Sequence, residues 1–167
     1  ANANAVKELV IAALLMSSRK INESVAWVHT LANDAEISKT IEKNKAAFVG
    51  PEIMGKTLGV VGLGAIGAMV ANAASALGMK VIGYDPYMSV KSAWKLSRHV
   101  DITASLDEIY ENADIICIHA PLTDETKGFV NAESIAKMKD GVVIANLSRA
   151  DLVKDADIEV ALNDGKV

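Results

Sequence analysis

The hydrophobic pattern divides the chain into two parts. Over residues 6–28 the apolar side chains recur at spacings of three, four and seven, which is the period of an α-helix. We therefore predict one long amphipathic helix there. Residues 33–45 are mostly polar, with Ile37 and Ile41 four positions apart, which fits a second, more exposed helix or an irregular connection. Gly50 and Pro51 then mark a turn.

Beyond Lys56, short apolar runs rich in β-branched residues alternate with stretches of helical periodicity. This alternation is typical of βαβ units, in which helices connect parallel strands. The run from Ile115 to Ile118 is apolar at every position, which indicates a strand covered by helices on both faces. We therefore predict an α/β fold: a doubly wound parallel sheet with helices on both faces, preceded by the long N-terminal helix. The predicted strands span residues 57–61, 80–84, about 99–102, 114–119 and 142–146, and the predicted helices span residues 66–77, 106–111, 131–138 and 151–163.

Three glycines directly follow the first predicted strand. Gly62, Gly64 and Gly67 form the pattern GxGxxG at the start of a predicted helix. In that setting the first glycine permits a tight turn, the second lets the backbone approach a pyrophosphate, and the third lets the helix pack closely on the strand. The helix N-terminus also attracts phosphate groups. Alone the motif is weak, because glycine triplets also occur in plain turns.

Asp85 strengthens this interpretation. It ends the second predicted strand about 20 residues after the glycines, where a carboxylate can bind the hydroxyls of an adenosine ribose. The alternative is a helix cap or a surface acid. Glycines and acid together predict a Rossmann-type domain over residues 51–167, with residues 1–50 as an N-terminal helical segment leading into it. NAD is favoured over NADP, because Asp85 would repel a 2′-phosphate and no arginine follows it immediately.

Composition and charge narrow the class of partner. With 51% hydrophobic and 23% charged residues, the chain is neither disordered nor collagen-like. A net charge of -4 without a Lys/Arg cluster argues against a nucleic-acid surface, and no apolar run reaches the roughly 18 residues of a membrane span. Cys117, the single cysteine, lies in an apolar run and cannot form an internal disulfide. We expect a small-molecule partner, no nucleic-acid or membrane partner, no metal site and a cytoplasmic location.

The chain contains five segments with a recognisable pattern, at residues 4–10, 55–67, 77–86, 119–128 and 146–149. Together, and in this order, they resemble the D-isomer-specific 2-hydroxyacid dehydrogenases, and within them the 3-phosphoglycerate dehydrogenases. The resemblance covers nearly the whole chain. The chain has no initiating methionine and ends where a strand could begin, so we expect a piece of a longer protein that lacks the substrate-binding domain.

The resemblance implies particular contacts. Arg149 would be the catalytic residue that grips the substrate carboxylate and polarises its carbonyl. A planar guanidinium can do so through two parallel hydrogen bonds, although without the resemblance a surface cation is equally plausible. His119 invites an acid/base role, but in the family the proton-transferring histidine and its orienting glutamate lie beyond Val167. Ala150 stands where the family usually has glycine, which could shift the loop holding Arg149. The implied NAD contacts are Gly62, Gly64, Ala65, Ile66, Gly67, Asp85, His119, Ala120, Pro121, Thr126, Leu147 and Ser148.

By this resemblance the intact protein transfers a hydride between NAD and a D-2-hydroxy acid, with 3-phosphoglycerate oxidised to 3-phosphohydroxypyruvate in serine biosynthesis as the leading expectation. Lactate and glycerate are alternative substrates. Two other classes stay open: an NAD-sensing, corepressor-like binding module of the same family, and a domain for another ligand such as an adenosyl cofactor. The apolar stripe of the N-terminal helix suggests a homodimer through this region, and burial within its own domain is the alternative.

Overall fold

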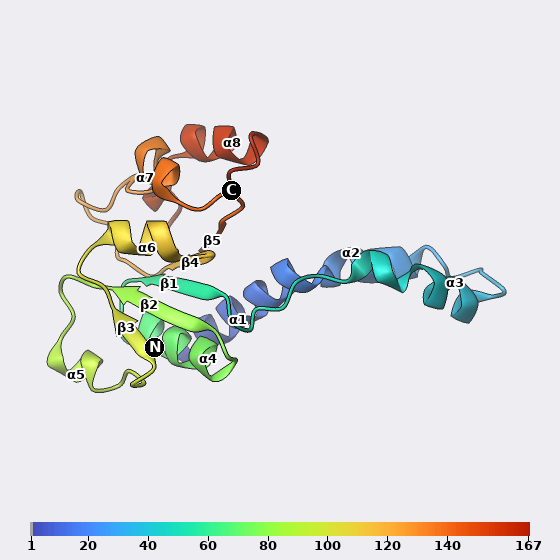
Figure 1. The fold of residues 1–167 in the computed structure, drawn as a ribbon, viewed down its shortest axis with the longest axis horizontal. Coiled ribbons are helices and arrows are strands. Elements are labelled where there is room, and N and C mark those ends of the chain that lie inside the picture. Colours follow the sequence, from blue (N-terminus) through green and yellow to red (C-terminus); the bar gives the residue numbers. More distant parts are fainter. Residues whose placement is uncertain (1) are drawn as a thin grey trace.

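A five-stranded parallel sheet forms the centre of the protein, whose computed structural model describes residues 2–167 (Figure 1). The strand order is β3-β2-β1-β4-β5, so the first strand is central and the order reverses beside it. In doubly wound sheets, ligands bind at such a reversal, outside the carboxyl ends of the strands. The strands are β1 (Thr57–Val61), β2 (Lys80–Tyr84), β3 (Val100–Ile102), β4 (Ile115–Ile118) and β5 (Val143–Asn146).

Helices cover both faces of the sheet. α1 and α4 lie on one face, and α6, α7 and α8 lie on the other (Figure 1). A short helix, α5, follows β2, and the sequence pattern did not predict it. The helices are α1 (Ala3–Arg19), α2 (Ile21–His29), α3 (Ile37–Asn44), α4 (Ala65–Ala76), α5 (Val90–Ala93), α6 (Leu106–Asn112), α7 (Ala132–Lys137) and α8 (Asp155–Asn163), with single 3-10 turns η1 (Lys45–Phe48) and η2 (Ala150–Leu152).

Each face of the sheet has its own hydrophobic core. Successive residues of β4 alternate between the two: Ile115 and Cys117 join the core beneath α1 and α4, and Ile116 and Ile118 join the opposite one. The predicted α/β fold with helices on both faces is thereby confirmed. Burial raises the pKa of the Cys117 thiol to about 12, so this cysteine is a packing residue rather than a nucleophile.

The prediction of one helix over residues 6–28 is wrong. α1 ends at Arg19, Lys20 adopts a left-handed conformation with φ 50°, and α2 begins at Ile21. The helical spacing of apolar residues continues across this break. A single residue with a positive φ does not change that spacing, so the sequence pattern could not reveal it. A left-handed lysine costs about 1 kcal/mol. Its Nζ donates to the carbonyl of Ala47 at 3.3 Å, which ties the break to the returning chain.

The break divides the apolar stripe. Val10 and Leu14 of α1 are buried in the core with α4, whereas α2, α3 and η1 contain no buried residue and project from the domain as an arm (Figure 1). Within the arm the ring of Trp27 stacks on that of Phe48, with centroids 4.9 Å apart. The helix predicted as one option for residues 33–45 is present as α3. No helix over residues 2–167 has the length and apolar character that crossing a membrane requires.

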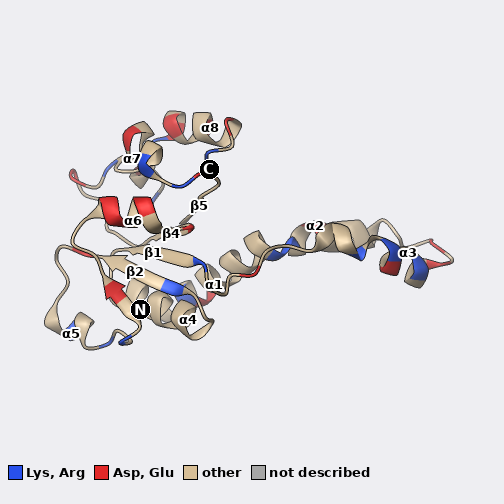
Figure 2. Cartoon of the chain, viewed as in Figure 1, with Lys and Arg blue, Asp and Glu red and all other residues tan. Residues whose placement is uncertain are grey.

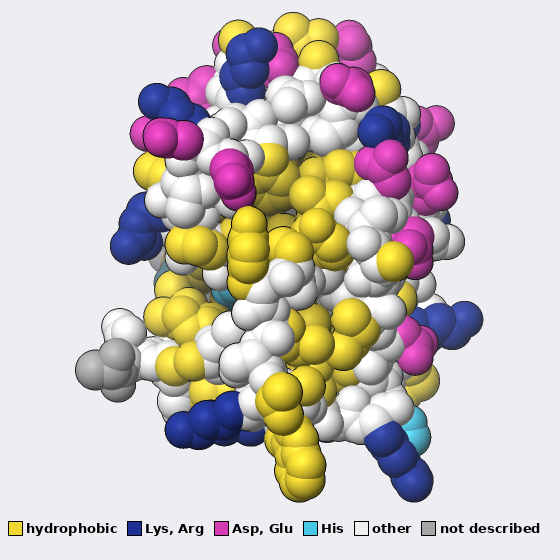
Figure 3. Space-filling view, turned by 90° about the vertical axis from the view of Figure 1, so that its left-hand side faces the viewer, with side chains coloured by type: hydrophobic (Ala, Val, Ile, Leu, Met, Phe, Trp, Pro, Cys, Tyr) yellow, Lys and Arg dark blue, Asp and Glu magenta, His cyan; other side chains and the backbone are white. Residues whose placement is uncertain are grey.

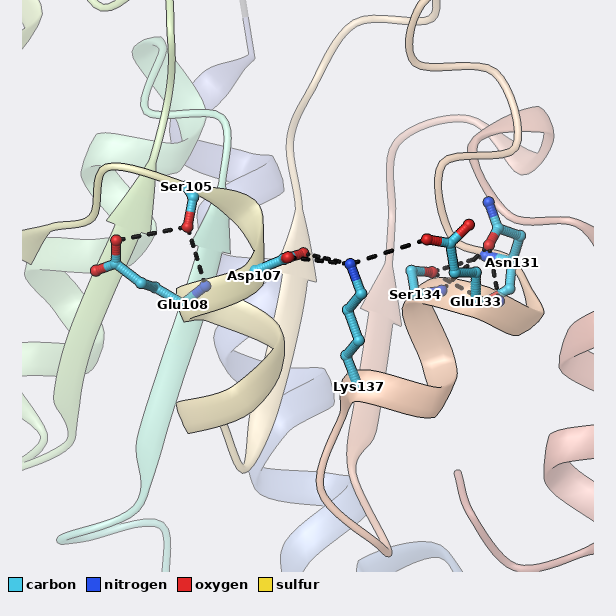
Figure 4. Close-up of polar contacts among 7 residues, drawn as sticks. All are labelled: Ser105, Asp107, Glu108, Asn131, Glu133, Ser134 and Lys137. Carbon is cyan, nitrogen blue, oxygen red and sulfur yellow. Dashed lines mark hydrogen bonds and ion pairs between the residues drawn. The ribbon is translucent and has the colours of Figure 1, made fainter.

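Side-chain caps fix the helices beside the carboxyl edge. The Ser105 hydroxyl accepts a hydrogen bond from the Glu108 N–H at the start of α6. The Asn131 side chain accepts from the N–H groups of Glu133 and Ser134 at the start of α7 (Figure 4). An ion pair of 2.9 Å between Lys137 and Asp107 then joins the two helices (Figure 4). The loops before α6 and α7 therefore have fixed ends.

Candidate cofactor site

A cavity of about 620 Å³ opens at the carboxyl edge of the sheet. The ends of β1, β2 and β4, the loops after them and the start of α6 form its walls. Figure 3 faces this edge and shows a hollow lined by hydrophobic side chains, with Asp and Glu around its upper part. Of the residues that the sequence predicts for the cofactor, those lining the cavity are Gly62, Gly64, Asp85, His119, Ala120, Pro121 and Thr126.

The glycine turn leaves no room for side chains at its two ends. Gly62 has φ +92°, and a Cβ on it would lie 2.8 Å from the backbone nitrogen of Ala120. A Cβ on Gly67 would lie 1.9 Å from the carbonyl oxygen of Gly62, so α4 approaches the strand as the motif predicts. A Cβ on Gly64, between them, would meet no atom within 4 Å. The middle of the turn is therefore open to a ligand, as binding of a pyrophosphate requires.

Ala65, Ile66 and Gly67 form the first turn of α4 and do not line the cavity. The first N–H groups of a helix have no partner within it, and together with the helix dipole they favour an anion. These three residues can therefore act on a diphosphate through their backbone, and their side chains remain available for packing. Ile66 packs against the core shared by α1 and α4.

Asp85 faces the glycine turn. Its Oδ2 accepts a hydrogen bond of 2.9 Å from the Leu63 N–H within the turn, and its Oδ1 accepts one of 2.9 Å from the Tyr87 N–H. Both bonds fix the carboxylate at the end of β2, on the wall of the cavity. Carboxylate oxygens have further lone pairs, so Asp85 can still accept from ribose hydroxyls. The arrangement of turn, helix N-terminus and carboxylate fits a dinucleotide.

The loop after β4 forms the opposite wall. The Thr126 hydroxyl donates to the Pro121 carbonyl at 2.6 Å and accepts from the Thr123 N–H at 2.8 Å, so it fixes the loop from within. The Nε2 atom of His119 is buried and has no hydrogen-bond partner among residues 2–167. This desolvation lowers the pKa of His119 to about 4, so the ring is neutral at physiological pH.

Leu147, Ser148 and Arg149 follow β5 and do not line the cavity. The Ser148 hydroxyl donates to the Ala120 carbonyl at 3.2 Å, which connects their loop to the cavity wall. Asn146 shapes the loop, since its side chain accepts from the Ser148 N–H at 3.1 Å and donates to the Arg149 carbonyl at 2.8 Å. The Arg149 side chain is exposed, and its Nη1 donates to the Ser148 carbonyl at 3.0 Å.

Sequence reasoning missed the apolar and rim residues of the cavity. Their common signal is position, since they end a strand, begin α6 or lie in the loops between. No motif marks them, and only the sheet order shows which loops meet. They include Tyr84, Pro86, Tyr87, Leu106, Glu125 and Phe129.

A family comparison agrees with the geometry. The model of the D-isomer specific 2-hydroxyacid dehydrogenase, NAD binding domain, matches residues 11–167. The chain belongs to this family. The resemblance drawn from five sequence segments is confirmed, and NAD is the cofactor of this family's domain.

The chain is similar to several named dehydrogenases of D-2-hydroxy acids. It is 44% identical over 129 residues to the D-3-phosphoglycerate dehydrogenase of Bacillus subtilis, covering 77% of this chain and 24% of the relative. It is 40% identical over 166 residues to that of Mycobacterium tuberculosis, covering 99% and 29%. A D-lactate dehydrogenase from Aquifex aeolicus, complexed with NAD and lactic acid, superposes with a TM-score of 0.81 at 30% identity, covering 99% of this chain and 46% of that one. The chain thus spans less than a third of these two curated relatives.

Proposed function

We propose that this domain is part of an enzyme that transfers a hydride between NAD and a D-2-hydroxy acid, and that the acid is 3-phosphoglycerate, oxidised to 3-phosphohydroxypyruvate in serine biosynthesis. The observation that carries the proposal is the glycine turn with Asp85 fixed against it at the carboxyl edge of the sheet. The choice of acid is supported by the names of the two relatives, at 44% and 40% identity.

In this proposal NAD supplies the nicotinamide that accepts the hydride, and the chain binds and orients. The first turn of α4 attracts the pyrophosphate, Asp85 accepts from the adenosine ribose, and the loops after β4 and β5 flank the remainder. Arg149 holds the substrate carboxylate. Its guanidinium is exposed and pairs with no carboxylate of residues 2–167, so it is available to a substrate.

Cofactor binding by the chain is tested by thermal shift with NADH, NADPH and S-adenosylmethionine, because a ligand that binds only the folded state raises the melting temperature. NADH should raise it most. The chain alone should show little or no turnover, since the acid/base pair is expected beyond Val167. A larger shift with S-adenosylmethionine, or dehydrogenase activity from the chain alone, would contradict the proposal.

The substrate is tested by assaying the full-length protein with 3-phosphoglycerate, lactate and glycerate. We expect the highest kcat/KM with 3-phosphoglycerate. Arg149→Lys should lower kcat/KM by about 10- to 100-fold, because the ammonium group cannot form two parallel hydrogen bonds to a carboxylate. Normal activity of this variant would remove Arg149 from the mechanism.

We also propose a two-fold dimer through the arm. In α2 the apolar side chains of Ile21, Val25 and Val28 are 41%, 52% and 42% exposed, so the domain does not cover them. The molar mass in solution tests this, and Val25→Asp should give a monomer. The matched control is Val160→Asp, since Val160 is 59% exposed on α8, away from the arm. A wild-type monomer, or equal effects of both variants, would disprove the arrangement.

A cytoplasmic location is part of the same proposal. Cys117, the single cysteine, is a buried free thiol, which suits a reducing compartment. Cell fractionation with an antibody against the protein tests it, and recovery from a secreted fraction would contradict it.

A further inference from the structure

Two loops meet at the rim of the cofactor cavity. Tyr87 lies in the loop after β2 and Glu125 in the loop after β4, and both line the cavity. The Tyr87 hydroxyl donates a hydrogen bond of 3.3 Å to Glu125 Oε2. Glu125 is an exposed turn residue, and this bond holds its carboxylate over the cavity.

Tyr87 also contacts the predicted ribose-binding acid. Its backbone N–H donates to Asp85 Oδ1 at 2.9 Å, so a single tyrosine is bonded to both carboxylates. Asp124 lines the same cavity, whereas no Lys or Arg of residues 2–167 does. Lys and Arg are instead spread over the domain and the arm (Figure 2). The adenosine end of the cavity is therefore negative without a lining cation.

We propose that Glu125, positioned by Tyr87, is a second determinant of selectivity for NAD over NADP, acting together with Asp85. The inference rests on NAD occupying this cavity as proposed above. NADP carries an additional phosphate on the adenosine 2′ oxygen, which brings about -1.5 to -2 charges at neutral pH. That phosphate would meet carboxylates from two loops and no lining cation, so removing either charge should weaken the repulsion.

Asp85 alone cannot test this charge effect. Its Oδ2 accepts from the Leu63 N–H at 2.9 Å, so replacing Asp85 also loosens the turn that both cofactors need. The Glu125 side chain makes its hydrogen bond to Tyr87 and not to the glycine turn. Substituting Glu125 therefore separates charge from turn geometry.

The test is a fluorescence titration of the 167-residue chain with NADH, and displacement of NADH by NADPH, at low ionic strength. Glu125→Gln should tighten NADPH binding by about five-fold and leave NADH within about two-fold. Tyr87→Phe keeps the charge of Glu125 but removes the hydrogen bond that positions it. This variant should tighten NADPH binding by about two-fold. Glu133→Gln removes an equal charge from an exposed position on α7 outside the cavity, and should change neither cofactor.

The gain for NADPH should shrink as salt is raised, because salt screens exposed charges. Misfolding cannot produce tighter binding, so a gain in the Glu125 variant supports the inference directly. An unchanged ratio of NADPH to NADH affinity in that variant overturns it, and the proposed function stands. If the wild-type chain does not bind NADH, the proposed function and this inference both fail.

Discussion

Gly64 and Gly67, three residues apart in the same turn, should respond differently to alanine: both variants should bind NADH more weakly, but only Gly67→Ala should lose stability. In Gly67→Ala the new Cβ would lie 1.9 Å from the Gly62 carbonyl oxygen, whereas Cβ atoms in proteins essentially never come closer than 3.0 Å to another heavy atom. The two backbones must therefore separate by at least about 1.1 Å. Gly62 cannot yield easily, because its N–H is bonded to the Tyr84 carbonyl at 2.8 Å.

The cost of that separation can be placed on a scale. Overpacking of a close-packed site costs about 1 to 3 kcal/mol, and a contact between two backbones belongs at the upper end. Alanine regains about 1 kcal/mol over glycine within a helix. We therefore expect Gly67→Ala to lower the free energy of unfolding by about 2 kcal/mol. NADH binding should weaken as well, because the N-terminus of α4 moves away from the turn.

Gly64→Ala should keep its stability and still lose affinity for NADH. The added methyl group would meet nothing within 4 Å, and a φ of -68° suits any residue. The free energy of unfolding should therefore stay within about 1 kcal/mol of the wild type. The methyl group would, however, stand where the pyrophosphate approaches the backbone, so the Kd for NADH should rise about ten-fold or more.

Urea unfolding followed by circular dichroism measures the free energy of unfolding, and NADH titration measures the Kd. Gly64→Ala is the control for the stability loss of Gly67→Ala, since the same methyl group is added within one turn. Wild-type stability of Gly67→Ala would refute the close approach of α4 to the strand. Wild-type NADH affinity of Gly64→Ala would refute the placement of the pyrophosphate.

Two further predictions concern stability. Burial lowers the pKa of His119 from 6.5 to about 4, so between these values the unfolded state binds the extra proton and stability falls as the pH falls. The free energy of unfolding, measured with urea, should fall by about 2 kcal/mol between about pH 7.5 and pH 5. His119→Asn should make this dependence on pH flatter. The same pH dependence in the variant and the wild type would contradict the desolvation of His119. Asn131→Ala should cost about 1 kcal/mol in the same assay, because two N–H groups of α7 lose their cap. Asn112→Ala, which removes one exposed bond at the end of α6, should cost less.

The sequence predicted the parts of the site that depend on local geometry. The roles of Gly62 and Gly67 follow from a turn between a strand and a helix, and Asp85 follows from its position at the end of the next strand. The walls from Leu106 and Phe129 depend on which strands become neighbours, which no local pattern states. Lys20 was missed for a related reason, since the contacts that offset its left-handed conformation come from a segment about 27 residues later. The cofactor and substrate contacts assigned to the site residues, including Leu147, Ser148 and Arg149, remain predictions.

The binding turn is held by the same contacts that build the core. Val70 of α4 packs with Val10 of α1 in one core, Gly67 fixes the start of α4 against Gly62, and Asp85 fixes the turn between them. A turn ordered before the cofactor arrives loses little entropy on binding, so affinity for NAD should be a property of this domain alone. Arg149 is different, because within residues 2–167 its guanidinium donates a hydrogen bond only to the Ser148 carbonyl, so a substrate or another part of the protein must orient it. Selectivity for the hydroxy acid should therefore depend on the part of the protein that faces the carboxyl edge of the sheet. Selectivity for the cofactor should depend on the residues of that edge itself.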